Sequence, residues 1–100
     1  GFLEINNSWY MNHGKCKYFN NLNSFLLDVY KNPVIEQYIR FSPGGNYIIP
    51  KENILKYSKN FYERIREYMS HDIITAEIWM IERATYTIFT CGWEVNEKYK

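Results

Sequence analysis

The chain has 100 residues, of which 46% are hydrophobic, and this predicts one domain with one modest core. The formal net charge is +1, and the Lys and Arg residues are interleaved with Glu, which disfavours nucleic acid as a partner. No run approaches the roughly 18 consecutive apolar residues that a membrane span requires, and no basic-then-apolar signal stands at the N-terminus. The compartment stays open. Because the chain begins with Gly1 and not with Met, we expect it to be a fragment of a longer protein.

The first part of the chain is predicted to be a strand followed by a loop. Residues 2–5 alternate weakly between apolar and polar side chains, as a strand does. Residues 6–21 are rich in Asn and Lys but carry scattered aromatic side chains, which tend to bury their area. We therefore expect residues 1–21 to form a loop region that is anchored by large side chains: Trp9, Tyr10, Met11, Tyr18 and Phe19.

A short helix and an ambiguous segment follow this loop. Asn23 or Ser24 can cap a helix that runs to Tyr30, and Asn32-Pro33 ends it. In residues 34–41 the apolar side chains fit a helical face slightly better than a strand. Those side chains are Val34, Ile35, Tyr38 and Ile39.

A junction of turn, strand and helix is predicted next. Pro43, Gly44 and Gly45 form a turn, because Gly permits positive φ and close approach of the backbone to a partner or a ligand. A short strand is expected near residues 46–49. Pro50 stops this strand and opens a helix directly after it, since its fixed φ suits a helix start and its missing N–H costs nothing there.

Two helices are predicted in the second half of the chain. Ser58 is a suitable N-cap for the first, whose apolar side chains recur at helical spacing: Phe61, Ile65 and Tyr68 or Met69. Asp72 can cap the second, over residues 73–90. One face of that helix is expected to be an apolar seam made by Ile74, Ile78, Ile81, Thr85 and Ile88.

The predicted end of the last helix is Gly92, in the left-handed conformation, and the charged tail of residues 96–100 is expected to fray. The fold class that follows is α+β: a helix-rich single domain, or a fragment of one, with a small β element. Residues 22–95 form its helical core.

The two cysteines and two histidines give weak signals. Cys16 and Cys91 allow one disulfide, but two buried thiols are equally compatible with the sequence. His13 and Cys16 have a spacing that could begin a zinc site, yet the only further ligands are His71 and Cys91, which stand far apart in the chain. An unrelated His and Cys in a loop is therefore the favoured interpretation, and no local base activates either thiol.

Glu82 is the candidate general acid or base. In the last predicted helix it stands beside Ile78, Trp79, Tyr86 and Phe89, and apolar surroundings raise the pKa of a carboxyl group. The alternative, which the sequence favours, is a surface carboxylate that bridges to Arg83 or Tyr86 at the edge of the core.

Arg40 and Arg83 are candidates for binding an anion such as a diphosphate, because a guanidinium makes forked contacts. Pairing with Glu36 or Glu82 accounts for both arginines equally well. Because the chain contains no aspartate-x-aspartate pair, it cannot assemble a divalent-metal sugar-nucleotide site by itself. The composition is typical of an AT-rich genome, since Asn, Ile, Lys and Tyr make up 41 of the 100 residues, and this lowers the weight of any motif built on Asn or Tyr.

Three short motifs carry a resemblance to a family over residues 41–90. They are Gly45-Asn-Tyr-Ile-Ile-Pro-Lys-Glu-Asn-Ile54, Phe61-Tyr-Glu-Arg64, and Ile81-Glu-Arg83 with Tyr86-Thr-Ile-Phe89. In this order they resemble the C-terminal part of domain-of-unknown-function family 3431. The chain departs from the family pattern at Pro43-Gly44, where cysteines often precede the strand, and it lacks the family's upstream half.

The resemblance implies a transferase. Some members of that family look like glycosyltransferases of the GT-A type, so the chain would be the C-terminal portion of a larger α/β fold that uses a nucleotide-sugar and an acceptor. By this analogy Glu82 or Asp72 would activate the acceptor hydroxyl, and Arg40 or Arg83 would steady the leaving diphosphate. The turn at Gly44 and Gly45 would shape the acceptor side of the cleft. The cofactor stays unknown, and a divalent metal is possible if the parent carries an acidic motif upstream.

A second hypothesis comes from a different class of function. The chain contains 10 Tyr and 3 Trp residues, which are enriched at protein interfaces. The domain would then be a non-catalytic packing or interaction module, with these aromatic side chains forming its partner surface.

Overall fold

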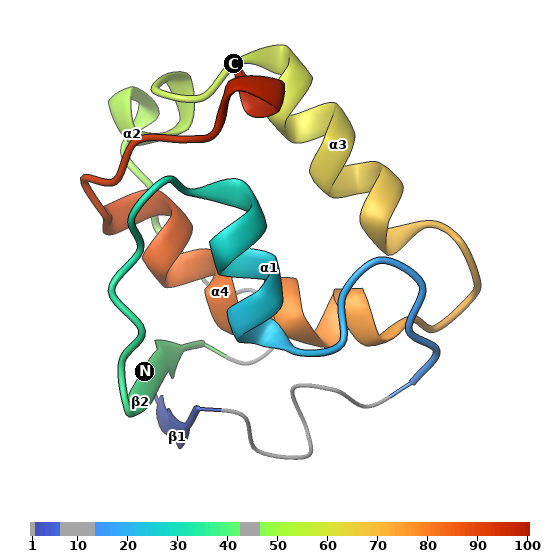
Figure 1. Ribbon diagram of the computed structural model, residues 1–100. Helices are drawn as coiled ribbons and strands as arrows, with labels where there is room; N and C mark the ends of the chain where they lie inside the picture. The colour runs from blue at the N-terminus through green and yellow to red at the C-terminus, as the bar shows by residue number, and fades with distance from the viewer. Residues whose placement is uncertain (1, 7–13, 43–46) are drawn as a thin grey trace.

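The computed structural model describes residues 2–6, 14–42 and 47–100, and their elements form a helix-rich α+β fold (Figure 1). Several residues of the predictions above lie outside the described residues: Trp9, Tyr10, Met11, His13, Pro43, Gly44 and Gly45. In chain order the elements are β1 (Phe2–Ile5), α1 (Leu22–Val29), β2 (Tyr38–Phe41), α2 (Lys51–Leu55), α3 (Lys59–Met69), α4 (Ala76–Thr90) and the 3-10 helix η3 (Glu97–Tyr99).

The first helix, α1, begins earlier than predicted. The side-chain oxygen of Asn21 accepts a hydrogen bond from the Ser24 N–H at 2.8 Å, so Asn21 is the N-cap in place of Asn23 or Ser24. The helix ends at Val29, before Asn32-Pro33 as expected. Its inner face is fully buried and supplies the centre of the core: Leu22, Phe25, Leu26 and Val29.

The sheet corrects two predictions. The strand at residues 2–5 is present, and it pairs antiparallel with β2, so the helical interpretation of residues 34–41 is wrong. In β2 the side chains of Ile39 and Phe41 are buried and those of Tyr38 and Arg40 are exposed, the alternation of a half-buried strand. The strand expected near residues 46–49 is also wrong for residues 47–49, which pair with neither strand. A strand needs a neighbour for its backbone hydrogen bonds, and apolar sequence alone does not supply one.

The predicted starts of α2 and α3 are confirmed. The Pro50 carbonyl accepts hydrogen bonds from the Asn53 and Ile54 N–H groups at 3.0 and 3.3 Å. Ser58 caps α3, because its Oγ accepts from the Phe61 N–H at 3.1 Å. As predicted, the buried face of α3 consists of Phe61, Ile65 and Tyr68.

The last helix, α4, starts three residues later than predicted. Thr75 is its N-cap and accepts from the Ile78 N–H at 3.2 Å, whereas Asp72 accepts from the Ile73 N–H and pairs with Lys15. Ile74 therefore lies outside the helix and is 60% exposed. The buried face is rotated from the predicted seam and consists of Ala76, Glu77, Met80, Ile81, Arg83, Ala84 and Ile88.

The end of α4 and the tail also differ from expectation. Gly92 does not take the left-handed conformation, since the helix ends in extended backbone at Cys91. The tail, predicted to fray from Asn96, folds back over the end of α1 (Figure 1). The Asn96 side-chain amide donates to the Asp28 carbonyl at 2.7 Å and also contacts the Tyr30 carbonyl, which satisfies acceptors that the helix end leaves open.

Tyr99 anchors this tail in the core. Its side chain is 1% exposed, and its hydroxyl lies 2.7 Å from that of Tyr68 and donates to the Asp28 carboxylate. The tail is mostly charged but contains one aromatic residue, Tyr99. The free energy gained by burying its ring outweighs the tendency of the neighbouring charged side chains to stay in solvent.

We expect Tyr99→Phe to lower the free energy of unfolding by about 1–2 kcal/mol, because it removes the hydroxyl that joins Tyr68 to Asp28 inside the core. Urea denaturation followed by circular dichroism measures the change. Tyr38→Phe is the matched control, since the Tyr38 side chain is 49% exposed. Equal stability of the two variants would contradict the anchoring role of Tyr99.

Candidate functional site

Glu82 and Arg83 are partners of each other. The Glu82 carboxylate accepts a hydrogen bond from the Arg83 guanidinium, which corresponds to the bridging alternative for Glu82. The Arg83 side chain is buried, and its guanidinium carbon lies 4.6 Å from the ring centroid of Phe41 and 5.5 Å from that of Trp79. The planar, positively charged guanidinium of Arg83 thus packs α4 against the Phe41 ring of β2.

The other predicted site residues lie elsewhere. Asp72 precedes α4 and forms an ion pair with Lys15 at 2.9 Å. Arg40 is exposed on β2, with its guanidinium 5.7 Å from the ring centroid of Tyr86. Because Glu82 stands six residues beyond the first residue of α4, it lies about 9 Å along the axis from the helix start. The structure therefore brings Glu82 and Arg83 together, and it does not place Asp72 beside them.

The cysteines are both free thiols, Cys16 exposed and Cys91 half-buried. Partial desolvation of the thiol and the nearby Glu77 carboxylate raise the pKa of Cys16, which opposes its activation as a nucleophile. Within residues 2–6, 14–42 and 47–100 no group of three or more His, Cys, Asp or Glu side chains is arranged to hold a metal ion.

Glu77 is the titratable residue that the sequence analysis missed. It is 0% exposed, and its Oε2 accepts hydrogen bonds from three consecutive backbone N–H groups, at 3.1, 2.7 and 3.2 Å. Those groups belong to Lys17, Tyr18 and Phe19. Its Oε1 lies 2.8 Å from His71 Nε2. The signal available in the sequence was its position one turn before Met80 and Ile81, on the buried side of α4.

The environment of Glu77 keeps its carboxylate charged. Burial by itself raises the pKa, but the hydrogen bonds from His71 and from the Tyr18 and Lys17 N–H groups outweigh burial, and the net pKa is lowered from 4.5. All of its acceptor capacity is directed at the loop and at His71. Glu77 therefore joins the loop at residues 17–19 and His71 to the start of α4.

Two neighbouring contacts also hold this loop against the start of α4. Lys15 pairs with Thr75 in a parallel bridge, and the Ala76 N–H donates to the Lys15 carbonyl at 2.8 Å. Gly14 has a φ of 101°, and a Cβ at this position would lie 3.1 Å from the Thr75 carbonyl carbon, so the loop can approach α4 this closely only with glycine there.

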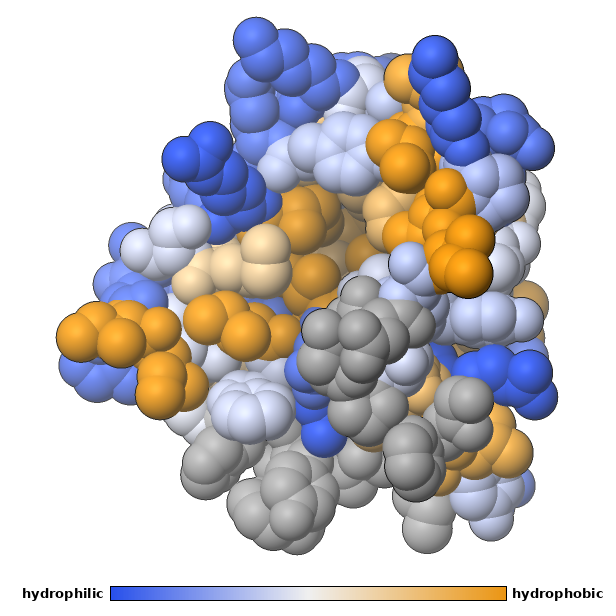
Figure 2. Space-filling model, turned by 180° about the vertical axis from the view of Figure 1, so that it is seen from behind, coloured by the Kyte–Doolittle hydropathy of each residue, from blue (hydrophilic) through white to orange (hydrophobic). Residues whose placement is uncertain are grey.

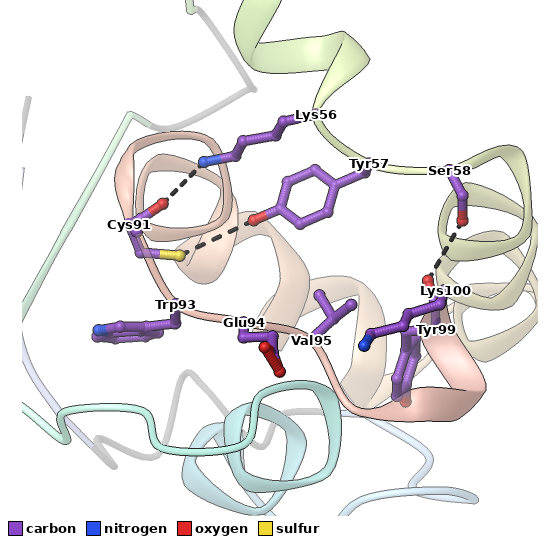
Figure 3. Close-up of a pocket in the computed structure, with 10 residues that line it drawn as sticks. Lys56, Tyr57, Ser58, Cys91, Trp93, Glu94, Val95, Tyr99 and Lys100 are labelled. Atoms are coloured by element: carbon purple, nitrogen blue, oxygen red, sulfur yellow. Dashed lines mark hydrogen bonds between the residues drawn. The ribbon is translucent and has the colours of Figure 1, made fainter.

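A cavity of about 510 Å³ lies between the α2–α3 junction, the end of α4 and the tail (Figure 3). Lys56 and Tyr57 reach across it toward Cys91, and Trp93 lies on the opposite wall. The Lys56 ammonium donates to the Cys91 carbonyl at 2.8 Å, and the Tyr57 hydroxyl lies 3.8 Å from the Cys91 sulfur. Its other lining residues are Ser58, Gly92, Glu94, Val95, Tyr99 and Lys100.

Tyr57 forms the inner wall of this cavity. Its hydroxyl donates to the Ile88 carbonyl and lies 2.7 Å from the Tyr30 hydroxyl. Burial is the main cause that raises the pKa of both phenols above the usual value for tyrosine. The ring of Tyr57 stacks on that of Phe61 with centroids 4.0 Å apart.

An apolar groove of about 460 Å³ lies along α2 and α3. We define the α2–α3 groove by the residues that line it: Ile54, Leu55, Tyr57, Lys59, Tyr62, Glu63 and Arg66. Ile54 is 40% and Leu55 67% exposed. From behind, the surface is hollowed, and hydrophobic side chains gather at the upper right, where α2 lies after the rotation from Figure 1 (Figure 2).

No protein-family model, curated protein or solved structure matches the chain. The resemblance to domain-of-unknown-function family 3431, and the larger GT-A fold that it implies, therefore stay predictions. None of the helices in the described part of the chain has the length and apolar character to cross a bilayer.

Glu77→Gln is expected to lower the free energy of unfolding at neutral pH by about 2–3 kcal/mol, because a neutral amide replaces an acceptor of charge-assisted hydrogen bonds. Since folding lowers the pKa of Glu77 from 4.5, its contribution is present above that pH and is lost as the pH falls through the folded-state pKa.

The stability difference between the wild type and Glu77→Gln should accordingly narrow on acidification. Chemical denaturation between neutral and strongly acidic pH measures it, with Glu63→Gln on the exposed face of α3 as the control that changes stability little. A difference that does not vary with pH would contradict the proposed origin of the effect.

Proposed function

We propose that this domain is a protein-interaction module whose α2–α3 groove binds an amphipathic helix with acidic flanks. The observation that carries the proposal is the exposure of Ile54 and Leu55 on α2, a helix that buries none of its own residues, beside the groove. Adjacent apolar side chains exposed beside a hollow are typical of surfaces that bind a partner.

The walls of the groove are held in place without a ligand. The Asn53 amide donates to the Phe89 carbonyl at 2.9 Å, and the Tyr62 hydroxyl donates to the Ile54 carbonyl at 2.5 Å. The ring of Tyr62 stacks near that of Phe89, with centroids 6.5 Å apart. α2 is thus attached to α3 and α4 through polar contacts while its apolar side chains stay exposed. A preformed groove loses little conformational entropy on binding.

The charge around the groove favours an acidic partner. Residues 51–69 contain five Lys or Arg and three Glu, an excess of two positive charges, whereas the whole chain has a net charge of +1. Lys59 pairs with Glu63 at 3.7 Å, and Arg66 forms no ion pair with any residue that the structure describes. Arg66 at the groove edge is therefore available to a carboxylate of the partner, which would set orientation and speed association.

The shape of the site favours a helix over an extended peptide. An apolar face with anchors at helical spacing fits a groove between packed helices, whereas an extended strand needs an open sheet edge. The described sheet has only its two short strands and lies on the other side of α4 from α3.

Binding can be measured by fluorescence polarisation with a designed helical peptide that carries Leu on one face and Glu on its flanks. Leu55→Asp should weaken binding about tenfold or more, because it places a charge in the apolar contact. Arg66→Glu should weaken the binding of the Glu-flanked peptide and strengthen the binding of a version with Lys flanks. Leu27→Asp is the matched control, since Leu27 is 57% exposed on α1 and does not line the groove.

Two outcomes would overturn the proposal. One is equal affinity of the Leu55→Asp and Leu27→Asp variants for the acidic peptide. The other is equal binding of the Glu-flanked and Lys-flanked peptides to the wild type.

The glycosyltransferase-like activity that the resemblance implies stays a prediction. If the domain has this activity, Glu82→Gln should abolish nucleotide-sugar turnover while the melting temperature of the domain is unchanged, and Glu52→Gln on α2 should preserve turnover. Unfolding of the domain by Glu82→Gln would instead show that the fold requires the ion pair between Glu82 and Arg83.

A further inference from the structure

We infer that the cavity beneath Lys56 is a binding site for a small molecule that joins a flat ring to an anionic group. This site goes beyond the proposed α2–α3 groove, because it opens between the tail and the end of α4 (Figure 3). Its volume of about 510 Å³ is within the range of small-ligand pockets, roughly 300–1,000 Å³.

Lys56 supplies the group that recognises an anion. Its ammonium has one partner in the structure, the Cys91 carbonyl at 2.8 Å, and it forms no ion pair with any described residue. That bond, together with the Tyr57 ring centroid 5.1 Å away, holds the ammonium at the cavity. An ammonium has three N–H donors, so two remain for the oxygens of a ligand.

The carboxylates near the cavity do not cancel this charge. Glu94 pairs with Lys31 at 2.6 Å, and Glu97 pairs with Lys100 at 3.0 Å. Glu97 also lies 3.4 Å from Lys31, so two lysines together match the two acidic side chains of the tail. Lys56 is the positive charge that remains on the cavity wall, and this sets the sign of the ligand.

The aromatic walls favour a flat ring. The Trp93 indole packs edge-on with the fully buried Tyr30, with centroids 5.4 Å apart at 76°. Tyr57, on the other side, is held by its stacking on Phe61 and by its hydroxyl bonds. Because the Tyr57 hydroxyl already has hydrogen-bond partners, the inner wall offers a ligand apolar contact area more than hydrogen bonds. A ring between Trp93 and Tyr57 would bury apolar area at little entropic cost.

Three probes separate the two halves of this recognition. Phenyl phosphate carries a ring and an anion, inorganic phosphate the anion alone, and benzyl alcohol the ring alone. Titrations followed by the amide chemical shifts of the wild type should give the tightest binding for phenyl phosphate. The largest shifts should fall on residues 56–58 and 91–95.

The variants assign each half to a residue. Lys56→Gln should lower the affinity for phenyl phosphate about tenfold or more and leave the affinity for benzyl alcohol unchanged, because only the charge-assisted hydrogen bonds are lost. Trp93→Leu should weaken both ring-bearing probes. Trp93→Phe provides a second, smaller change if Trp93→Leu alters the fold. The matched control is Lys51→Gln, a lysine on α2 that does not line the cavity.

Three results would overturn the inference. They are equal effects of Lys51→Gln and Lys56→Gln, inorganic phosphate binding as tightly as phenyl phosphate, and chemical shifts outside the cavity. Leu55→Asp in the α2–α3 groove should leave phenyl phosphate binding unchanged. Failure of the helix-binding proposal and failure of this one are therefore distinguishable.

Discussion

The burial of the Glu77 carboxylate is the constraint on which the rest of this small fold depends. A charge with no exposure is tolerable only when it is fully hydrogen-bonded, and three consecutive backbone N–H groups and His71 meet that requirement. The consequence is long-range order, because the loop at residues 15–19 is fastened to the start of α4. Phe19 is thereby placed against Phe25 and Tyr68, with ring centroids 5.4 and 4.9 Å away. One polar contact thus positions part of the hydrophobic core.

The C-terminal tail closes the other end of the core, and it creates the cavity as it does so. Asn96 satisfies carbonyls at the end of α1, and Tyr99 fills the space between α1 and α3. Residues 91–95 connect the end of α4 to these anchors. Together with Lys56 they line the cavity. Stability and the candidate ligand site therefore depend on the same few contacts.

The arrangement of charged side chains supports the two proposed binding sites. Each of three acidic side chains has a partner. Glu77 accepts hydrogen bonds from the loop, and Glu82 and Asp72 form ion pairs with Arg83 and Lys15. Lys56 and Arg66, in contrast, have no carboxylate partner among the described residues, and each lies beside apolar or aromatic surface. Unpaired cations beside such surfaces are suited to recognise anions or acidic partners.

The sequence by itself determined the local features of this protein: the strand at residues 2–5, the Ser58 cap, the buried face of α3 and the helix-rich α+β class. These follow from spacing and capping within a few residues. The tertiary structure alone decided the pairing of residues 38–41 with 2–5, the burial of Glu77 and the anchoring of Tyr99. Their partners stand far away in the chain, about 60 residues for Glu77 and its loop and about 70 for Tyr99 and Asp28. A local pattern carries no information about a partner at that distance.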